Sequence, residues 1–130
     1  MAKFKNVLLI DDDPLTILIC EKMMAITGFC DNVNATMNGT LGLNYLREKV
    51  DSDHENIPQI ILLDLNMPPL NGWEFLDQFA QIAPSIETAP PIYILSSTVD
   101  PEDLKRAMSY ASVKGFISKP LTKEQLDAIV

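Results

Sequence analysis

Carboxylate side chains follow two of the apolar segments of this 130-residue chain, at positions where strands would end. Asp11 and Asp12 come directly after the first segment, and Asp64 follows the third. Three carboxylates brought together in a partly dry cleft repel one another unless a cation neutralises them. Because the ligands are all oxygen atoms, Mg²⁺ fits best, and Mn²⁺ could replace it. The three residues therefore predict a divalent metal site.

A hydroxyl and a lysine follow two further segments. Ser96 comes after the fourth apolar segment and Lys119 after the fifth. Together with a divalent ion, the hydroxyl and the lysine can bind a phosphoryl group. Transfer of such a group depends mainly on positioning and on stabilisation of its charge. One carboxylate would then be the nucleophile and form an aspartyl phosphate. Asp13 precedes Pro14 and is instead assigned to capping the helix that follows.

Five apolar segments alternate with helix signals along the chain. Parallel strands joined by helical crossovers make an open α/β sheet, so we predict a flavodoxin-like, doubly wound (βα)5 fold whose five-stranded parallel sheet has the order 2-1-3-4-5. Ligands of such sheets bind at the carboxyl ends of the strands, so the residues above should converge there. The expected strands are 7–10, 30–35, 60–63, 92–95 and 115–118. The first helix should end at Gly28, and the helix after the fourth strand should run from Pro101 to about Tyr110. The last helix should begin with a capping box at Thr122 and end with the chain at Val130.

Composition narrows the function classes. Eighteen acidic residues against ten basic ones give a formal net charge of −8, which disfavours direct binding to nucleic acid.

No apolar run approaches a membrane span of roughly 18 residues and no signal peptide is evident, so we expect a cytoplasmic protein with no membrane association. The length predicts a single domain over residues 1–130, with no output domain. Cys20, Cys30 and the lone His54 fit neither a zinc site nor a histidine-dependent triad.

The chain also resembles a known family in four separated stretches. These stretches are Val7 to Pro14, Ile61 to Pro68 followed by Asn71-Gly72, Ile94 to Ser97, and Gly115 to Pro120. Their order and spacing, over essentially the whole chain, are similar to those of the receiver domains of two-component response regulators. Such a domain is a signalling module that catalyses its own phosphorylation and dephosphorylation, rather than an enzyme acting on separate substrates.

The resemblance implies how the phosphoryl group arrives. Asp64 would accept it from the phosphohistidine of a histidine kinase or a histidine phosphotransfer protein. Asp12 and Asp64 would ligate Mg²⁺ directly, Asp11 would help through water, and the backbone carbonyl of Asn66 would complete the protein ligands. The phosphorylated domain would then signal to a downstream protein target or pass the group on.

The resemblance also implies a conformational switch. Lys119 would pair with one phosphoryl oxygen, and the hydroxyl of Ser96 would swing to another. Phe116 occupies the aromatic switch position and would turn inward. By the same pattern, the bond between Lys119 and Pro120 is expected to be cis.

The first helix carries more apolar residues than one buried face needs. At roughly 100° per residue, one face holds Cys20 and Met24, which leaves Leu15 and Leu18 pointing away from it. Exposed apolar clusters next to a site mark interaction surfaces, and in receivers the phosphodonor docks on this helix. The alternative, that scattered exposed leucines are ordinary, stays open.

Two other function classes compete with the receiver. In a haloacid-dehalogenase-like phosphatase, Asp11-x-Asp13 followed by Thr16 would be the first motif, but the threonine comes one residue late and no acidic pair follows Lys119. A phosphorylation-independent, receiver-like scaffold would lack the phosphosite or the lysine, and this chain has both Asp64 and Lys119.

Overall fold

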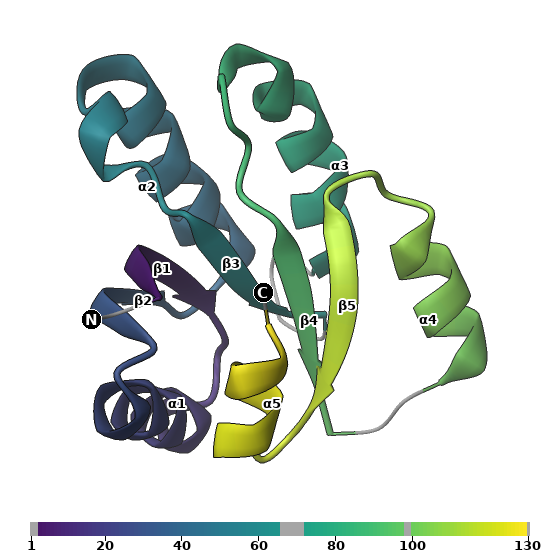
Figure 1. The fold of residues 1–130 in the computed structure, drawn as a ribbon. Helices are drawn as coiled ribbons and strands as arrows, with labels where there is room; N and C mark the ends of the chain where they lie inside the picture. The colour runs from purple at the N-terminus through teal and green to yellow at the C-terminus, as the bar shows by residue number, and fades with distance from the viewer. Residues whose placement is uncertain (1–2, 66–71, 98–99, 130) are drawn as a thin grey trace.

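The computed structural model of the chain describes residues 3–65, 72–97 and 100–129. Its strands pair in parallel in the order β2-β1-β3-β4-β5 (Figure 1), which confirms the predicted flavodoxin-like sheet. β1 and β3 are central, so both strands that end in carboxylates lie side by side. The strands are β1 (Phe4–Ile10), β2 (Cys30–Thr36), β3 (Ile60–Asp64), β4 (Ile92–Ser96) and β5 (Val113–Ser118).

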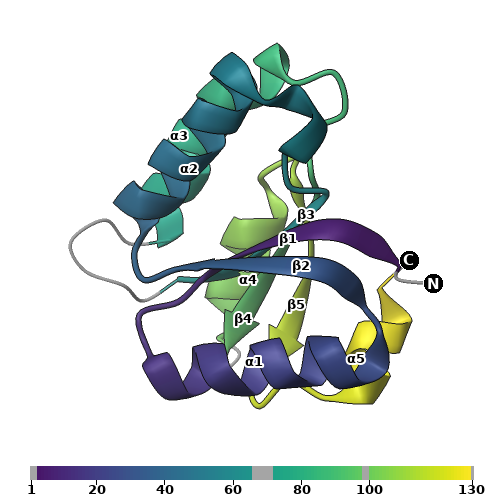
Figure 2. The same cartoon turned by 90° about the vertical axis from the view of Figure 1, so that its left-hand side faces the viewer.

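Helices cover both faces of the sheet. α1 and α5 lie on one face, and α2, α3 and α4 lie on the other (Figure 2). Alternate residues of β1 point into two separate cores, which explains why the central strands are apolar without interruption. Within the described ranges, none of the helices is long and apolar enough to cross a membrane. They are α1 (Pro14–Thr27), α2 (Gly39–Ser52), α3 (Gly72–Ile82), α4 (Pro101–Met108) and α5 (Lys123–Ala128), with short 3-10 turns at His54–Asn56 and Ala83–Ser85.

The helices begin where the sequence places capping side chains. The Asp13 carboxylate accepts from the Leu15 amide at 3.1 Å, and Thr122 forms the predicted capping box with Gln125. α1 stops at Gly28, whose φ of 68° is the left-handed conformation that favours glycine. The capped starts of these helices fix the loops at the carboxyl edge of the sheet, where the candidate site lies.

Several predicted boundaries differ from the structure: β1 begins at Phe4 rather than Val7, and β2, β3 and β4 each end one residue later than predicted. α4 ends at Met108 rather than near Tyr110, because the chain turns there and the Tyr110 amide bonds to the Ala107 carbonyl at 3.1 Å. α5 ends at Ala128, before the predicted end at Val130, because Ile129 is extended and buries its side chain in the core beneath α1 and α5. β5 begins at Val113, ahead of the predicted start, because that residue already pairs with β4.

α4 is held to the domain by few buried groups. Ala107 is the single buried residue among those of α4. Side-chain contacts connect α4 and its C-terminal turn to α3: the Arg106 guanidinium lies 4.1 Å from the centre of the Trp73 ring, the Trp73 and Tyr110 ring centres lie 6.5 Å apart, and the Tyr110 hydroxyl donates to Asp77 at 2.6 Å. This hydrogen bond raises the pKa of Tyr110. We call these four residues the α3–α4 clamp.

Candidate functional site

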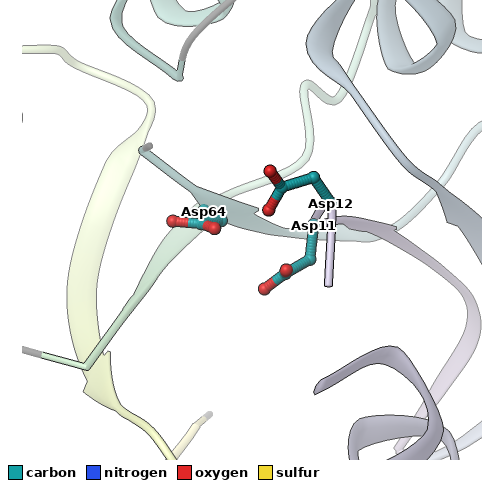
Figure 3. A group of neighbouring side chains, drawn as sticks. All are labelled: Asp11, Asp12 and Asp64. Carbon is teal, nitrogen blue, oxygen red and sulfur yellow. The ribbon is translucent and has the colours of Figure 1, made fainter. Parts of the chain in front are cut away.

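The three predicted carboxylates lie together at the carboxyl edge of the sheet. Asp64 is the last residue of β3, and Asp11 and Asp12 follow β1 and extend toward it (Figure 3). One ligand oxygen from each residue lies within 4.8 Å of the other two. Asp11 is fully buried and Asp64 nearly so, whereas Asp12 is exposed. Two of the carboxylates are thus fixed in the protein, and the third faces solvent.

Lys119 reaches this cluster from the end of β5. Its ammonium lies 2.7 Å from an oxygen of Asp11 and 3.5 Å from an oxygen of Asp64. Burial alone would lower the pKa of Lys119, but the hydrogen bond to Asp11 and the charges of Asp64 and Asp11 outweigh burial and raise the pKa. The bond to Pro120 is cis, as predicted, and the Lys119 amide donates to the Ser96 carbonyl at 2.8 Å.

The fit of a divalent cation can be judged from the donor set. The cluster offers carboxylate oxygens and neither nitrogen nor sulfur ligands. Mg²⁺ and Mn²⁺ prefer such oxygen ligands, whereas Zn²⁺ prefers nitrogen and sulfur. A single lysine charge balances only part of the charge of three carboxylates, so a divalent ion would bring the cluster close to neutrality. Asn66, whose carbonyl was the fourth predicted ligand, lies outside the described residues.

The two predicted switch residues occupy adjacent strands. Ser96 is the last residue of β4 and pairs with Ser118 of β5. Phe116 pairs with Ile94, is half-buried, and packs against the core on the α2–α4 face. Ser96 thus ends β4 at the carboxyl edge, and Phe116 lies two positions earlier along the ladder between β4 and β5.

The leucines predicted to point away from the core do so. Leu15 is 62% exposed and Leu18 48%. Ile19 and Ile26, which were not among the predicted docking residues, extend the same exposed face along α1. At 100° per residue, all four lie within one arc of the helix, so the helical pattern could have identified the longer stripe.

A parallel five-stranded sheet with an acidic cluster and a lysine at its carboxyl edge defines the receiver class of signalling domains. Comparison with protein families agrees: the model of the response regulator receiver domain matches residues 7–130. The chain belongs to this family. Receiver domains of two-component systems act with histidine kinases or phosphotransfer proteins, and family membership favours this class over the phosphatase alternative.

Individual relatives are consistent with this membership. The chain is 29% identical over 124 residues to the probable methanogenesis regulatory protein FilR2 of Methanothrix harundinacea, covering 95% of this chain and 77% of that protein. It is 31% identical to the nitrate/nitrite response regulator NarL of Escherichia coli, covering 93% of this chain but half of that protein. A two-component response regulator structure from Cytophaga hutchinsonii superimposes with a TM-score of 0.87 at 32% identity, covering 95% and 92% of the two chains.

Proposed function

We propose that this receiver domain accepts a phosphoryl group on Asp64 from the phosphohistidine of a histidine kinase or a histidine phosphotransfer protein, in a Mg²⁺-dependent reaction. The convergence of three carboxylates and Lys119 at one edge of the sheet carries the proposal. The phosphorylated domain signals to a downstream protein target or passes the phosphoryl group on.

Asp64 is the nucleophile of the proposed reaction. One of its carboxylate oxygens attacks phosphorus, the P–N bond to the donor imidazole breaks, and the imidazole takes up the electron pair and a proton. Lys119, which lies 3.5 Å from Asp64, pairs with a phosphoryl oxygen and offsets its charge. Attack by water on phosphorus of the resulting acyl phosphate later breaks its P–O bond to Asp64, releases inorganic phosphate and restores the carboxylate.

Asp11, Asp12 and Asp64 would hold the metal ion, together with the backbone carbonyl of Asn66. When bound, Mg²⁺ or Mn²⁺ supplies positive charge against the phosphoryl oxygens. Asp11 and Asp64 are buried, whereas Asp12 is exposed and would present its carboxylate on the solvent side of the site.

The conformational response begins beside the phosphorylated residue. An added phosphoryl group carries charge and strong acceptor oxygens, which attract the hydroxyl of Ser96. Movement at the end of β4 leaves space for Phe116, whose strand partner is Ile94, to turn from its half-buried position into the core. The face formed by α4, β5 and α5 would report the change to the target.

The phosphodonor docks on α1. Leu15 and Leu18 are exposed on α1, and a cavity of about 370 Å³ is lined in part by other residues of this helix, Thr16 and Ile19, together with Pro120. Replacing Leu15 and Leu18 by Ser should slow phosphotransfer from the kinase and leave phosphorylation by acetyl phosphate unchanged. Equal loss of both rates would argue against docking.

Intact mass spectrometry tests the proposed chemistry. The chain is incubated with acetyl phosphate and Mg²⁺ and compared with Asp64→Asn and with Asp127→Asn, a control at an exposed carboxylate of α5. We expect one added phosphoryl group that requires Mg²⁺, is absent in Asp64→Asn and persists in Asp127→Asn. No adduct, even with beryllofluoride as a mimic, would favour the scaffold, and steady turnover of the donor that requires Asp11 would favour the phosphatase.

A further inference from the structure

Asp13 makes hydrogen bonds through its backbone and through its side chain in the short segment between β1 and α1. Its amide donates to an oxygen of Asp11 at 2.9 Å, and its carbonyl accepts from the amide of Ile17 at 3.0 Å. Its carboxylate accepts from the Leu15 amide at 3.1 Å and from the Thr16 hydroxyl at 2.9 Å. The side chain of Asp13 thus fixes the backbone that holds Asp11.

The two donors that reach Asp11 differ in rigidity. One oxygen accepts from the Asp13 amide, which the start of α1 holds in place, and the other lies 2.7 Å from the ammonium of Lys119. Lys119 has a long side chain with several rotatable bonds, and its charge is also directed at Asp64. When the ammonium turns to a phosphoryl group, the Asp13 amide is the donor that stays with this buried carboxylate.

Resting on the proposed function, we propose that Asp13 is a positioning residue: its side chain orients the Asp11 carboxylate for metal binding by holding the amide that bonds to it. Asp13 is exposed and is not part of the cluster of ligand atoms formed by Asp11, Asp12 and Asp64. Groups that orient a metal ligand typically change affinity by about 10–100-fold when they are removed. The contribution of Asp13 therefore comes from its geometry and not from its charge.

Two substitutions separate geometry from charge. Asp13→Asn keeps an oxygen that caps the helix about as well and removes the charge, whereas Asp13→Ala removes both. Asn38→Ala is the matched control, because the Asn38 side chain caps α2 by accepting from the Leu41 amide at 2.9 Å. All variants and the wild type are titrated with Mg²⁺ by calorimetry, and exchange of the amide of residue 13 is followed by NMR without metal.

We expect Asp13→Ala to bind Mg²⁺ about tenfold more weakly and to exchange its residue-13 amide faster. Asp13→Asn should stay within about threefold of the wild type in affinity and keep the amide protected, since Asn is an equivalent cap. Asn38→Ala should match the wild type in both measurements.

Two results would overturn the positioning role. Unchanged Mg²⁺ affinity in Asp13→Ala would show that the cap does not matter for the site, and equal weakening in Asp13→Asn would show that charge is what counts. A wild type that binds no Mg²⁺ would instead overturn the proposed metal-dependent function, so the two failures are distinguishable.

Discussion

The ammonium of Lys119 lies closer to Asp11, at 2.7 Å, than to the proposed phosphoacceptor Asp64, at 3.5 Å. The lysine therefore balances the most deeply buried carboxylate before any phosphoryl group is present. It also places a positive charge beside two of the carboxylates that would hold a divalent ion.

Substitution of this lysine should separate metal binding from phosphoryl transfer. We expect Lys119→Met to bind Mg²⁺ about tenfold more tightly, because a positive charge beside the cluster is removed. The rate of phosphorylation by acetyl phosphate should fall, because the phosphoryl oxygens lose a cation. Lys123→Met, at an exposed lysine of α5, is the control. Weaker Mg²⁺ binding in Lys119→Met, measured by calorimetry, would contradict this electrostatic account.

The start of α3 lies against the backbone of Asp64, the proposed phosphoacceptor, and Leu65. A Cβ atom at Gly72 would lie 2.5 Å from the Cα of Leu65 and 2.8 Å from the carbonyl oxygen of Asp64. We expect Gly72→Ala to lower the free energy of unfolding by about 1–3 kcal/mol, because backbone atoms must move. Gly42→Ala is the comparison, since its contact at 2.6 Å is with the end of the Ile10 side chain. Equal losses in urea unfolding would contradict the prediction.

The α3–α4 clamp can be observed through Trp73, the single tryptophan of the chain. We expect Arg106→Ala to expose the ring, which shifts its emission to longer wavelength and increases quenching by acrylamide. The loss of stability should be about 0.5–1 kcal/mol, typical of an exposed cation–π contact. Tyr110→Phe keeps the neighbouring ring but loses the hydrogen bond to Asp77, so it should change the emission less. Identical spectra for Arg106→Ala and the wild type would show that the guanidinium does not cover the ring.

The two thiols should react slowly with iodoacetamide near neutral pH. Burial raises the pKa of Cys20 to about 11, with Asp11 adding to this effect and Lys119 opposing it. Burial also raises the pKa of Cys30 to about 11. Because the thiolate is the reactive form, the rate should rise about tenfold per pH unit from pH 8 to 10. Cys30 should be labelled first, since it is half-buried whereas Cys20 is 1% exposed, and peptide mapping checks the order.

Much of the candidate site could be predicted from the residues that follow the apolar segments. The carboxyl ends of parallel strands share one edge of the sheet, so the sequence alone predicted that Asp11, Asp12, Asp64 and Lys119 lie together. The start of the first helix could be predicted because Asp13 precedes Pro14, and this local signal needs no tertiary contact. The family motif predicted the cis bond before Pro120, and the structure confirms it.

Other features depend on contacts that leave no periodic signal in the sequence. Trp73 and Arg106 lie on separate helices, and nothing in the spacing of either helix indicates that their side chains meet. The final helix was predicted too long because its capping box marks a start, whereas its end is set by Ile129, which enters the core in an extended conformation. Whether Lys119 favours Asp11 or Asp64 depends on side-chain geometry alone.

The strand order divides the site between the centre of the sheet and its border. Asp11 and Asp12 follow β1 and Asp64 ends β3, and each of these strands is flanked by strands on both sides. Phe116 lies in β5 and Lys119 directly follows it, and β5 pairs with β4 alone within the residues that the structure describes. A border strand can shift without breaking hydrogen bonds on a second side. The proposed metal ligands therefore lie at the ends of strands that are hydrogen-bonded on both sides, and a shift of β5 on phosphorylation would leave those ligands in place.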